Sequence, residues 1–134
     1  MPYYFEFAPG ERIFRCRMEG LVTDELILEY YGEVGRYVER AKPRAGILDL
    51  SGVTSWEVSN ETVRSLARSS PALVDSSMPR FIVAPAAHLF GTARMFQILG
   101  EETRPELHVS RTLDEAYAAL GVGWLKYERF KADD

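Results

Sequence analysis

Short apolar runs alternate with helical patterns along most of the chain, and this alternation constrains the fold more than any other feature. Two strand-like runs, Tyr3 to Phe7 and Arg12 to Met18, are separated by the turn-like segment Ala8-Pro9-Gly10-Glu11, which predicts an antiparallel hairpin. Further strands are expected at 46–50, 81–84 and 106–110. Because strands and helices alternate after the first helix, the pattern predicts right-handed crossovers, a mainly parallel sheet and an α/β domain. Its mixed, mainly parallel sheet has about five strands and is accompanied by about four helices.

The boundaries of the helices are marked by capping and terminating residues. Thr23 is placed to cap the first helix, and Pro43 stops it, because proline disfavours helical geometry in the residue before it. Ser59 is placed to cap a second, short helix, Leu89 to Leu99 form a third, and Thr112 begins a fourth that ends at Gly121. Cys16 shares its strand parity with Phe14 and Met18, which predicts a buried thiol.

Charge and composition exclude several classes of partner. The net charge is -4 and no Lys/Arg block occurs, so nucleic acid is not an expected partner. No run approaches the ~18 apolar residues of a membrane helix, and the first residues lack the pattern of a signal peptide. With one cysteine, the chain is expected in the cytoplasm. We expect one domain over residues 1–122 and a tail over 123–134, whose Trp124, Tyr127 and Phe130 are candidate contacts for a homodimer.

Candidate site residues follow from the rule that ligands bind at the carboxyl ends of parallel strands. This rule selects the segment from Ser51 to Asn60 as a recognition loop, and three helix N-termini are expected to converge there and favour an anion. Ser59 is expected to cap a helix, and the alternative is a phosphoryl acceptor. Arg94 is expected to reach solvent or to pair with a carboxylate of Glu57, Asp49 or Glu61, with anion binding as the alternative. The interaction and anion-binding candidates are Ser51, Thr54, Glu57, Asn60, His88 and Arg94.

The run Ile47-Leu48-Asp49-Leu50-Ser51-Gly52-Val53-Thr54, followed by Ser59, resembles the STAS domain of the anti-sigma-factor antagonists. It is most similar to a divergent bacterial branch that neighbours the lipid-binding SEC14 domains. In the antagonists, a partner kinase phosphorylates a serine in an Asp-Ser-Ser-Gly turn. The resemblance implies that Ser59 occupies this position, within Glu57-Val58-Ser59-Asn60. Val58 and Asn60 depart from the family's turn.

Two functions are therefore expected as alternatives. The first is a non-enzymatic regulatory or protein-interaction module whose partner is a protein, with a kinase-like regulator as one candidate and a phosphoswitch at Ser59. The second is a small-molecule or lipid-binding protein of the SEC14-related kind, in which the helix with Tyr30, Tyr31 and Tyr37 lines the pocket. No catalytic residues, metal or cofactor are expected, because the sequence has neither a Gly-x-Ser-x-Gly elbow nor ligands at metal-binding spacing.

Overall fold

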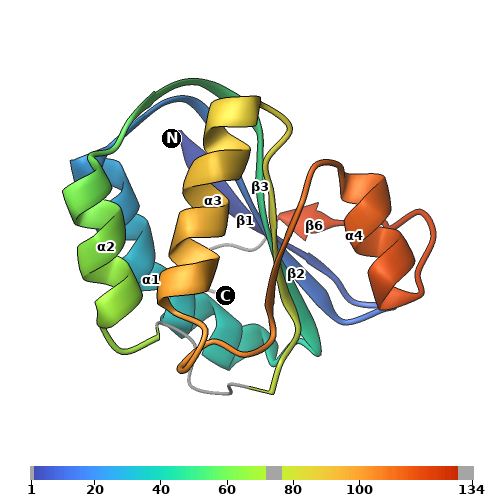
Figure 1. The fold of residues 1–134 in the computed structure, drawn as a ribbon. Helices are drawn as coiled ribbons and strands as arrows, with labels where there is room; N and C mark the ends of the chain where they lie inside the picture. The colour runs from blue at the N-terminus through green and yellow to red at the C-terminus, as the bar shows by residue number, and fades with distance from the viewer. Residues whose placement is uncertain (1, 72–76, 130–134) are drawn as a thin grey trace.

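The computed structural model describes residues 2–71 and 77–129 of the chain. They form a six-stranded mixed sheet in the order β5-β4-β3-β2-β1-β6, accompanied by four helices (Figure 1). The elements are β1 (Tyr3–Ala8), β2 (Ile13–Thr23), α1 (Asp24–Ala41), β3 (Ala45–Glu57), α2 (Asn60–Arg68), β4 (Arg80–Val83), α3 (Ala87–Leu99), β5 (Leu107–Ser110), α4 (Leu113–Leu120) and β6 (Glu128–Arg129).

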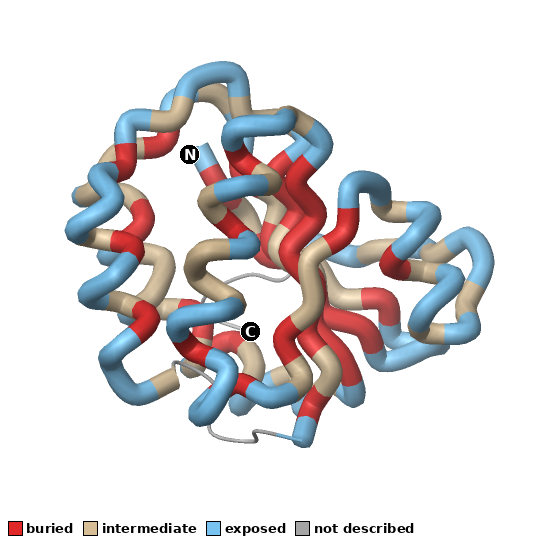
Figure 2. The backbone as a smooth tube through the Cα atoms, viewed as in Figure 1, coloured by how far each residue is buried: buried red, intermediate tan, exposed pale blue. Residues whose placement is uncertain are grey.

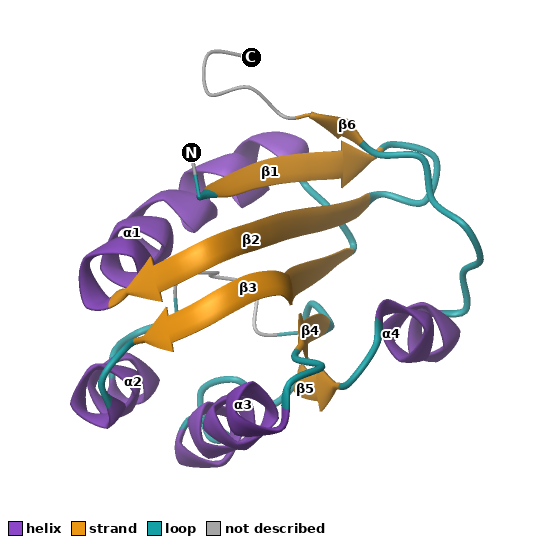
Figure 3. Ribbon diagram, turned by 90° about the horizontal axis from the view of Figure 1, so that it is seen from above, coloured by secondary structure: helices purple, strands orange, loops and turns teal. Residues whose placement is uncertain are grey.

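The predicted α/β class and N-terminal hairpin are confirmed. β1 pairs with β2 in the antiparallel sense, and the β2–β3, β3–β4 and β4–β5 pairs are parallel. The sheet has a sixth strand, β6, which pairs antiparallel with Glu6 and Phe7 of β1. In Figure 3, β6 lies beside β1 at the edge of the sheet. The described part of the tail therefore packs on the domain.

The predicted helix boundaries at Thr23, Ser59, Thr112 and Gly121 are confirmed, whereas α3 begins at Ala87, two residues before the predicted start at Leu89. The hydroxyl of Thr23 accepts a hydrogen bond from the backbone N–H of Leu26, and the hydroxyls of Ser59 and Thr112 cap α2 and α4 in the same way. Gly121 ends α4 at φ 73°, a left-handed conformation that glycine adopts without steric cost. Local side-chain chemistry thus decides where these helices begin and end.

The helices cover the two faces of the sheet unequally. Figure 1 shows α1, α2 and α3 on one side of the sheet and α4 on the other. The larger core, which includes the predicted buried Cys16, lies under the three helices, and a smaller core around Ile47 and Val83 lies under α4. Figure 2 shows buried backbone concentrated along the strands and exposed backbone on the outer turns of the helices. Part of the α4 side of the sheet remains uncovered.

The strand β3 is longer than predicted. We expected a strand at 46–50 followed by a loop, but Ser51 to Glu57 continue the strand. The reason is long-range pairing, because residues 52–57 pair in parallel with residues 19–23 of β2. β4 pairs only as far as Asp49, so these two strand ends project beyond β4. We call residues 19–23 and 52–57 the β2–β3 arm.

Candidate functional site

A cavity of about 160 Å³ lies between the sheet and the three helices α1, α2 and α3. Its walls are almost entirely apolar. The sheet contributes aliphatic side chains, α3 contributes the small residues Thr92 and Ala93, and the end of the β2–β3 arm contributes Trp56. Its aliphatic and aromatic wall residues include Ile27, Val34, Leu48, Leu50, Val58, Val63, Leu66, Ile82, Leu89 and Phe96. Because short side chains of α3 face the sheet here, the layers leave a space that larger residues would fill.

The polar groups of the cavity wall come from two tyrosines and two arginines. Tyr30 and Tyr31 of α1 lie next to each other in the chain, while Arg80 begins β4 and Arg104 precedes β5. Burial raises the pKa of the Tyr30 phenol well above its ordinary value, and the charge of Arg80 acts in the opposite direction. The phenol therefore keeps its proton at neutral pH and is a hydrogen-bond donor.

Arg104 connects the C-terminal end of α2 to α1 through hydrogen bonds. Arg104 is 3% exposed, and its guanidinium donates to the carbonyl oxygens of Leu66, Ala67 and Ser69 at 3.0, 2.9 and 3.2 Å. It also donates to the Tyr31 hydroxyl at 2.6 Å. Positive charge at the C-terminal end of α2 is favourable because the last carbonyls of a helix carry partial negative charge. Sequence reasoning missed Arg104, since no spacing pattern connects it to α2.

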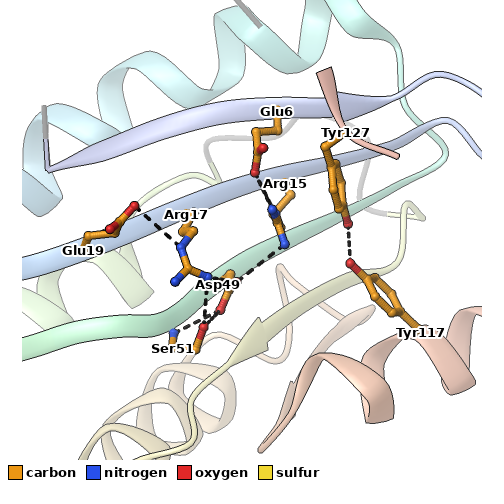
Figure 4. A network of polar contacts seen from close by, with 8 residues as sticks. All are labelled: Glu6, Arg15, Arg17, Glu19, Asp49, Ser51, Tyr117 and Tyr127. Atoms are coloured by element: carbon orange, nitrogen blue, oxygen red, sulfur yellow. Dashed lines mark hydrogen bonds and ion pairs between the residues drawn. The ribbon is translucent and has the colours of Figure 1, made fainter. Parts of the chain in front are cut away.

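The opposite face of the sheet carries a network of charged groups centred on Asp49 (Figure 4). Asp49 is 0% exposed, and its Oδ2 lies 3.1 Å from Arg17 Nη1 and 3.8 Å from Arg15 Nη1. Its Oδ1 accepts from the backbone N–H and the hydroxyl of Ser51 at 3.0 and 2.6 Å. Two cations and two neutral donors thus compensate the buried carboxylate.

A β-bulge explains the position of Asp49. Arg17 pairs with Asp49 whereas Glu19 pairs with Gly52, so β3 has one extra residue there, which interrupts the ladder of hydrogen bonds. The Asp49 carboxylate accepts from the Ser51 N–H in this interrupted region. A Cβ on Gly52 would lie 3.0 Å from the Met18 carbonyl oxygen, so a larger residue at this position would be crowded against the backbone of β2. The network therefore has a structural role in a strand that must curve.

Arg15 connects this network to the tail. It donates to Glu6 Oε1 at 2.6 and 2.9 Å, and its guanidinium lies 4.0 Å from the centre of the Tyr127 ring. The Tyr127 and Tyr117 hydroxyls are 2.7 Å apart. Tyr127, a candidate dimer contact, thus packs against its own chain. Trp124 is 100% exposed, and Phe130 lies outside the described residues.

Ser59 joins the first turns of α1 and α2. Its hydroxyl accepts from the Thr62 N–H at 3.1 Å, and its own N–H donates to Asp24 Oδ1 at 2.8 Å. The Ser59 hydroxyl also lies 3.4 Å from Asp24 Oδ2. A phosphoryl group on Ser59 would therefore meet a carboxylate, and repulsion between like charges would oppose the favourable effect of the helix N-terminus.

Replacing Ser59 with alanine is expected to lower the free energy of unfolding by about 1 kcal/mol, because the cap of α2 is lost. Urea unfolding followed by circular dichroism measures this change. Ser55→Ala is the matched control, because Ser55 is exposed on β3 and its replacement should have little effect. Equal stabilities of the two variants would contradict the capping role of Ser59.

The other predicted site residues do not form one recognition loop. Ser51, Thr54 and Glu57 belong to β3, and Asn60 is the first residue of α2. Ser51 contacts Asp49 on the α4 side of the sheet, whereas Ser59 lies between α1 and α2. The expectation of a single loop was wrong, because pairing with β2 extends the strand through its residues.

The two α3 residues lie at the surface. Arg94 is exposed, as the first of its two expected alternatives had it, and donates to Gln97 Oε1 at 2.6 Å, one turn along the same helix; it does not pair with Glu57, Asp49 or Glu61. His88 is exposed in the first turn of α3. The helix N-termini do not converge as expected, since α4 lies across the sheet from α2 and α3 (Figure 1). The anion site predicted there is therefore not assembled.

No group of three or more His, Cys, Asp or Glu residues is placed to hold a metal ion in residues 2–71 and 77–129. Within the same residues, no helix combines the length and apolar character needed to cross a bilayer.

Comparison with known proteins gives no match, either to the models of protein families or to curated protein sequences. The resemblance to STAS-like and SEC14-like domains therefore stays an expectation drawn from a short motif and the order of elements. The α/β class is established by the pairing of the strands. The apolar cavity is the feature from which a function can be argued.

Proposed function

We propose that this protein binds a small, largely apolar molecule in the cavity between α1, α2, α3 and the sheet, and acts as a carrier or sensor without catalysing a reaction. The proposal is supported by one observation, the apolar cavity of about 160 Å³. Protein interiors pack as densely as organic crystals, and voids larger than a water molecule are few. A space of this size therefore needs an explanation.

The energy of the empty cavity favours an occupant. Closed cavities in protein cores cost about 24 cal/mol per Å³ relative to filled space, and because this one is partly open to solvent, roughly 4 kcal/mol is the most that it lowers the stability of the empty protein. An engineered cavity of about 150 Å³ in another protein stays dry and binds benzene. By this comparison the occupant is a single ring or a short branched chain. Such a ligand is smaller than a complete lipid.

The two tryptophans of the chain make this proposal measurable. Trp56 lines the cavity and Trp124 is fully exposed, so the Trp124→Phe variant keeps one fluorophore at the binding site. Titration with ethylbenzene is expected to change the Trp56 emission in a saturable way, with one ligand per chain. The matched control is Trp56→Phe, in which Trp124 should report no saturable change.

An unchanged Trp56 emission up to the solubility limit of ethylbenzene, together with an unchanged melting temperature, would reject the proposal. The melting temperature is an independent measurement because a ligand that binds the folded state stabilises it by mass action.

The proposal also includes a cytoplasmic location. Its basis is the single cysteine of the sequence.

A second candidate function is a protein-interaction module, favoured by the β2–β3 arm. β4 pairs with β3 only as far as Asp49, so the outer edge of residues 51–57 has no neighbouring strand among the described residues. Exposed strand edges accept an added strand from a partner. Thr54 lies on this edge and is exposed. An identified partner that binds Thr54→Lys as tightly as the wild-type protein would exclude the arm as its contact.

The switch expected at Ser59 belongs to this second candidate. A phosphoryl group there would repel Asp24, which contacts Ser59 from the start of α1, and would loosen the junction of α1 and α2 at the end of the arm. Mass spectrometry of the protein from its native host tests for the modification, and its absence would remove the switch.

A further inference from the structure

The outer edge of β3 is open along the β2–β3 arm. β4 pairs with β3 only as far as Asp49, and among the described residues no other strand pairs with this side of residues 52–57. Figure 3 shows the ends of β2 and β3 extending past β4. Thr54, Ser55 and Glu57 are exposed on the arm. Such an edge presents backbone N–H and C=O groups with which an extended peptide can pair.

The charge along the arm and at its end has one sign. Residues 19–25 and 51–61 span the arm and the first turns of α1 and α2, and they contain no Lys or Arg. Both helices begin at the same end of the molecule, because β2 and β3 run in parallel as far as Thr23 and Glu57. The acidic side chains gathered there are Glu19, Asp24, Glu25, Glu57 and Glu61. Together they carry more negative charge than the net -4 of the whole chain.

Local structure explains only part of this charge. Negative side chains in the first turn of a helix stabilise it, which accounts for the acidic residues that begin α1 and α2. Glu19 lies 3.6 Å from Arg17 Nε. Glu57 is exposed at the end of β3, and no ion pair joins it to another residue in the described part of the chain. The charge of Glu57, beside the open edge, is therefore available to a partner.

The sign of the charge selects the occupant of this edge. A second copy of the chain would bring the same acidic segments to the same place, and repulsion between like charges disfavours that pairing. A strand with Lys or Arg side chains would pair its backbone with β3 and its charges with the acidic residues of the arm.

We infer that the arm binds a basic, extended segment of a partner protein, which adds a strand to the sheet along residues 52–57 of β3. The inference rests on the second candidate function, because it concerns the same edge, and it names the chemistry of the partner. It does not depend on the ligand of the cavity.

The test uses three fluorescein-labelled peptides with blocked termini, whose binding is measured by fluorescence anisotropy at low ionic strength. The first is Lys-Val-Lys-Val-Lys-Val-Lys. The second has Thr in place of each Lys, and is expected to bind about tenfold more weakly or less, because it lacks the charges. The third is the lysine peptide methylated at every backbone nitrogen. It is also expected to lose about tenfold or more, because it keeps the charges but has no N–H donors.

Substitutions in the protein locate the bound peptide. Glu57→Gln is expected to weaken the lysine peptide about threefold, the effect of one exposed ion pair, and to leave the threonine peptide unchanged. The matched control is Glu101→Gln, the same change at an exposed residue just after α3, which should alter neither. Circular dichroism confirms folding of Glu57→Gln, which loses no side-chain hydrogen bond or ion pair with a described residue.

The possible outcomes separate the inference from the function on which it rests. Equal affinities of the lysine and threonine peptides would overturn the basic partner and leave the arm as a docking edge. Tight binding of the methylated peptide would overturn strand addition, and lysine-peptide binding that Glu57→Gln does not weaken would overturn the arm as its site. If none of the peptides binds at concentrations up to about 1 mM, the second candidate function fails as well.

Discussion

Replacing Asp49 with alanine is expected to lower the free energy of unfolding by about 3 kcal/mol, because removing one partner from a buried ion pair leaves the other charges uncompensated. Arg17 would lose its 3.1 Å contact, and Ser51 would lose the carboxylate oxygen that accepts from both its N–H and its hydroxyl. The expected loss is at the lower end of the range for buried pairs, since Arg17 remains 29% exposed and Arg15 keeps Glu6. Urea unfolding followed by circular dichroism measures the change.

Glu19→Ala is the matched control for Asp49→Ala. Glu19 lies 3.6 Å from Arg17 Nε but is 51% exposed, and exposed ion pairs contribute about 0–1 kcal/mol. Both variants remove a carboxylate from Arg17, so their difference isolates the effect of burial and of the bulge. A loss below about 1 kcal/mol for Asp49→Ala would contradict the structural role of the network.

Filling the cavity should raise stability and abolish binding at the same time. Ala93 is buried on α3 and faces the cavity, so Ala93→Leu would place three additional carbon atoms in the empty space. At about 0.8 kcal/mol for each buried methylene, the free energy of unfolding should rise by roughly 1–2 kcal/mol, once some strain is allowed for. The affinity for ethylbenzene should fall by about tenfold or more, because the same space is occupied.

The opposite signs of these two effects distinguish a filled cavity from a damaged fold. Fluorescence titration of Trp56 measures the affinity, and urea unfolding measures the stability. Ala118→Leu is the control, because Ala118 is exposed on α4, across the sheet from the cavity, and should change neither quantity. If Ala93→Leu binds ethylbenzene as tightly as the wild-type protein, the ligand does not occupy the cavity.

The elements that sequence reasoning predicted well are those specified by local chemistry. The Thr23 hydroxyl caps α1 and Gly121 ends α4, and both follow from the few residues around them. The burial of Cys16 follows from strand parity. These features need no knowledge of distant segments, since capping and alternation depend on near neighbours in the chain.

The features that sequence reasoning missed depend on distant segments. Ser51 to Glu57 contain several residues typical of turns, yet pairing with β2 keeps them in a strand. β6 has two charged residues and no apolar pattern, so its pairing with β1 had no periodic signal. Arg94 reaches solvent, as one of its two expected alternatives had it, but its hydrogen bond to Gln97 one turn away was not predicted.

The candidate site was the least predictable part of the molecule. The pattern of α1 indicated a buried face with Tyr30 and Tyr31, and a ligand pocket along this helix was the second of two alternatives. The cavity itself depends on the volumes of side chains from three helices and the sheet, including Ala93 and Trp56. Such a space cannot be read from periodicity, because periodicity shows which residues face inward but not whether they fill the interior.

The most direct test of the central claim is a crystal structure of the protein in complex with ethylbenzene. We predict electron density for one ligand between α1, α2, α3 and the sheet, in contact with Trp56, Ala93 and other residues of the cavity wall. Density for the ligand at another place, or a cavity that stays empty at saturating ethylbenzene, would contradict the claim that this space is a binding site.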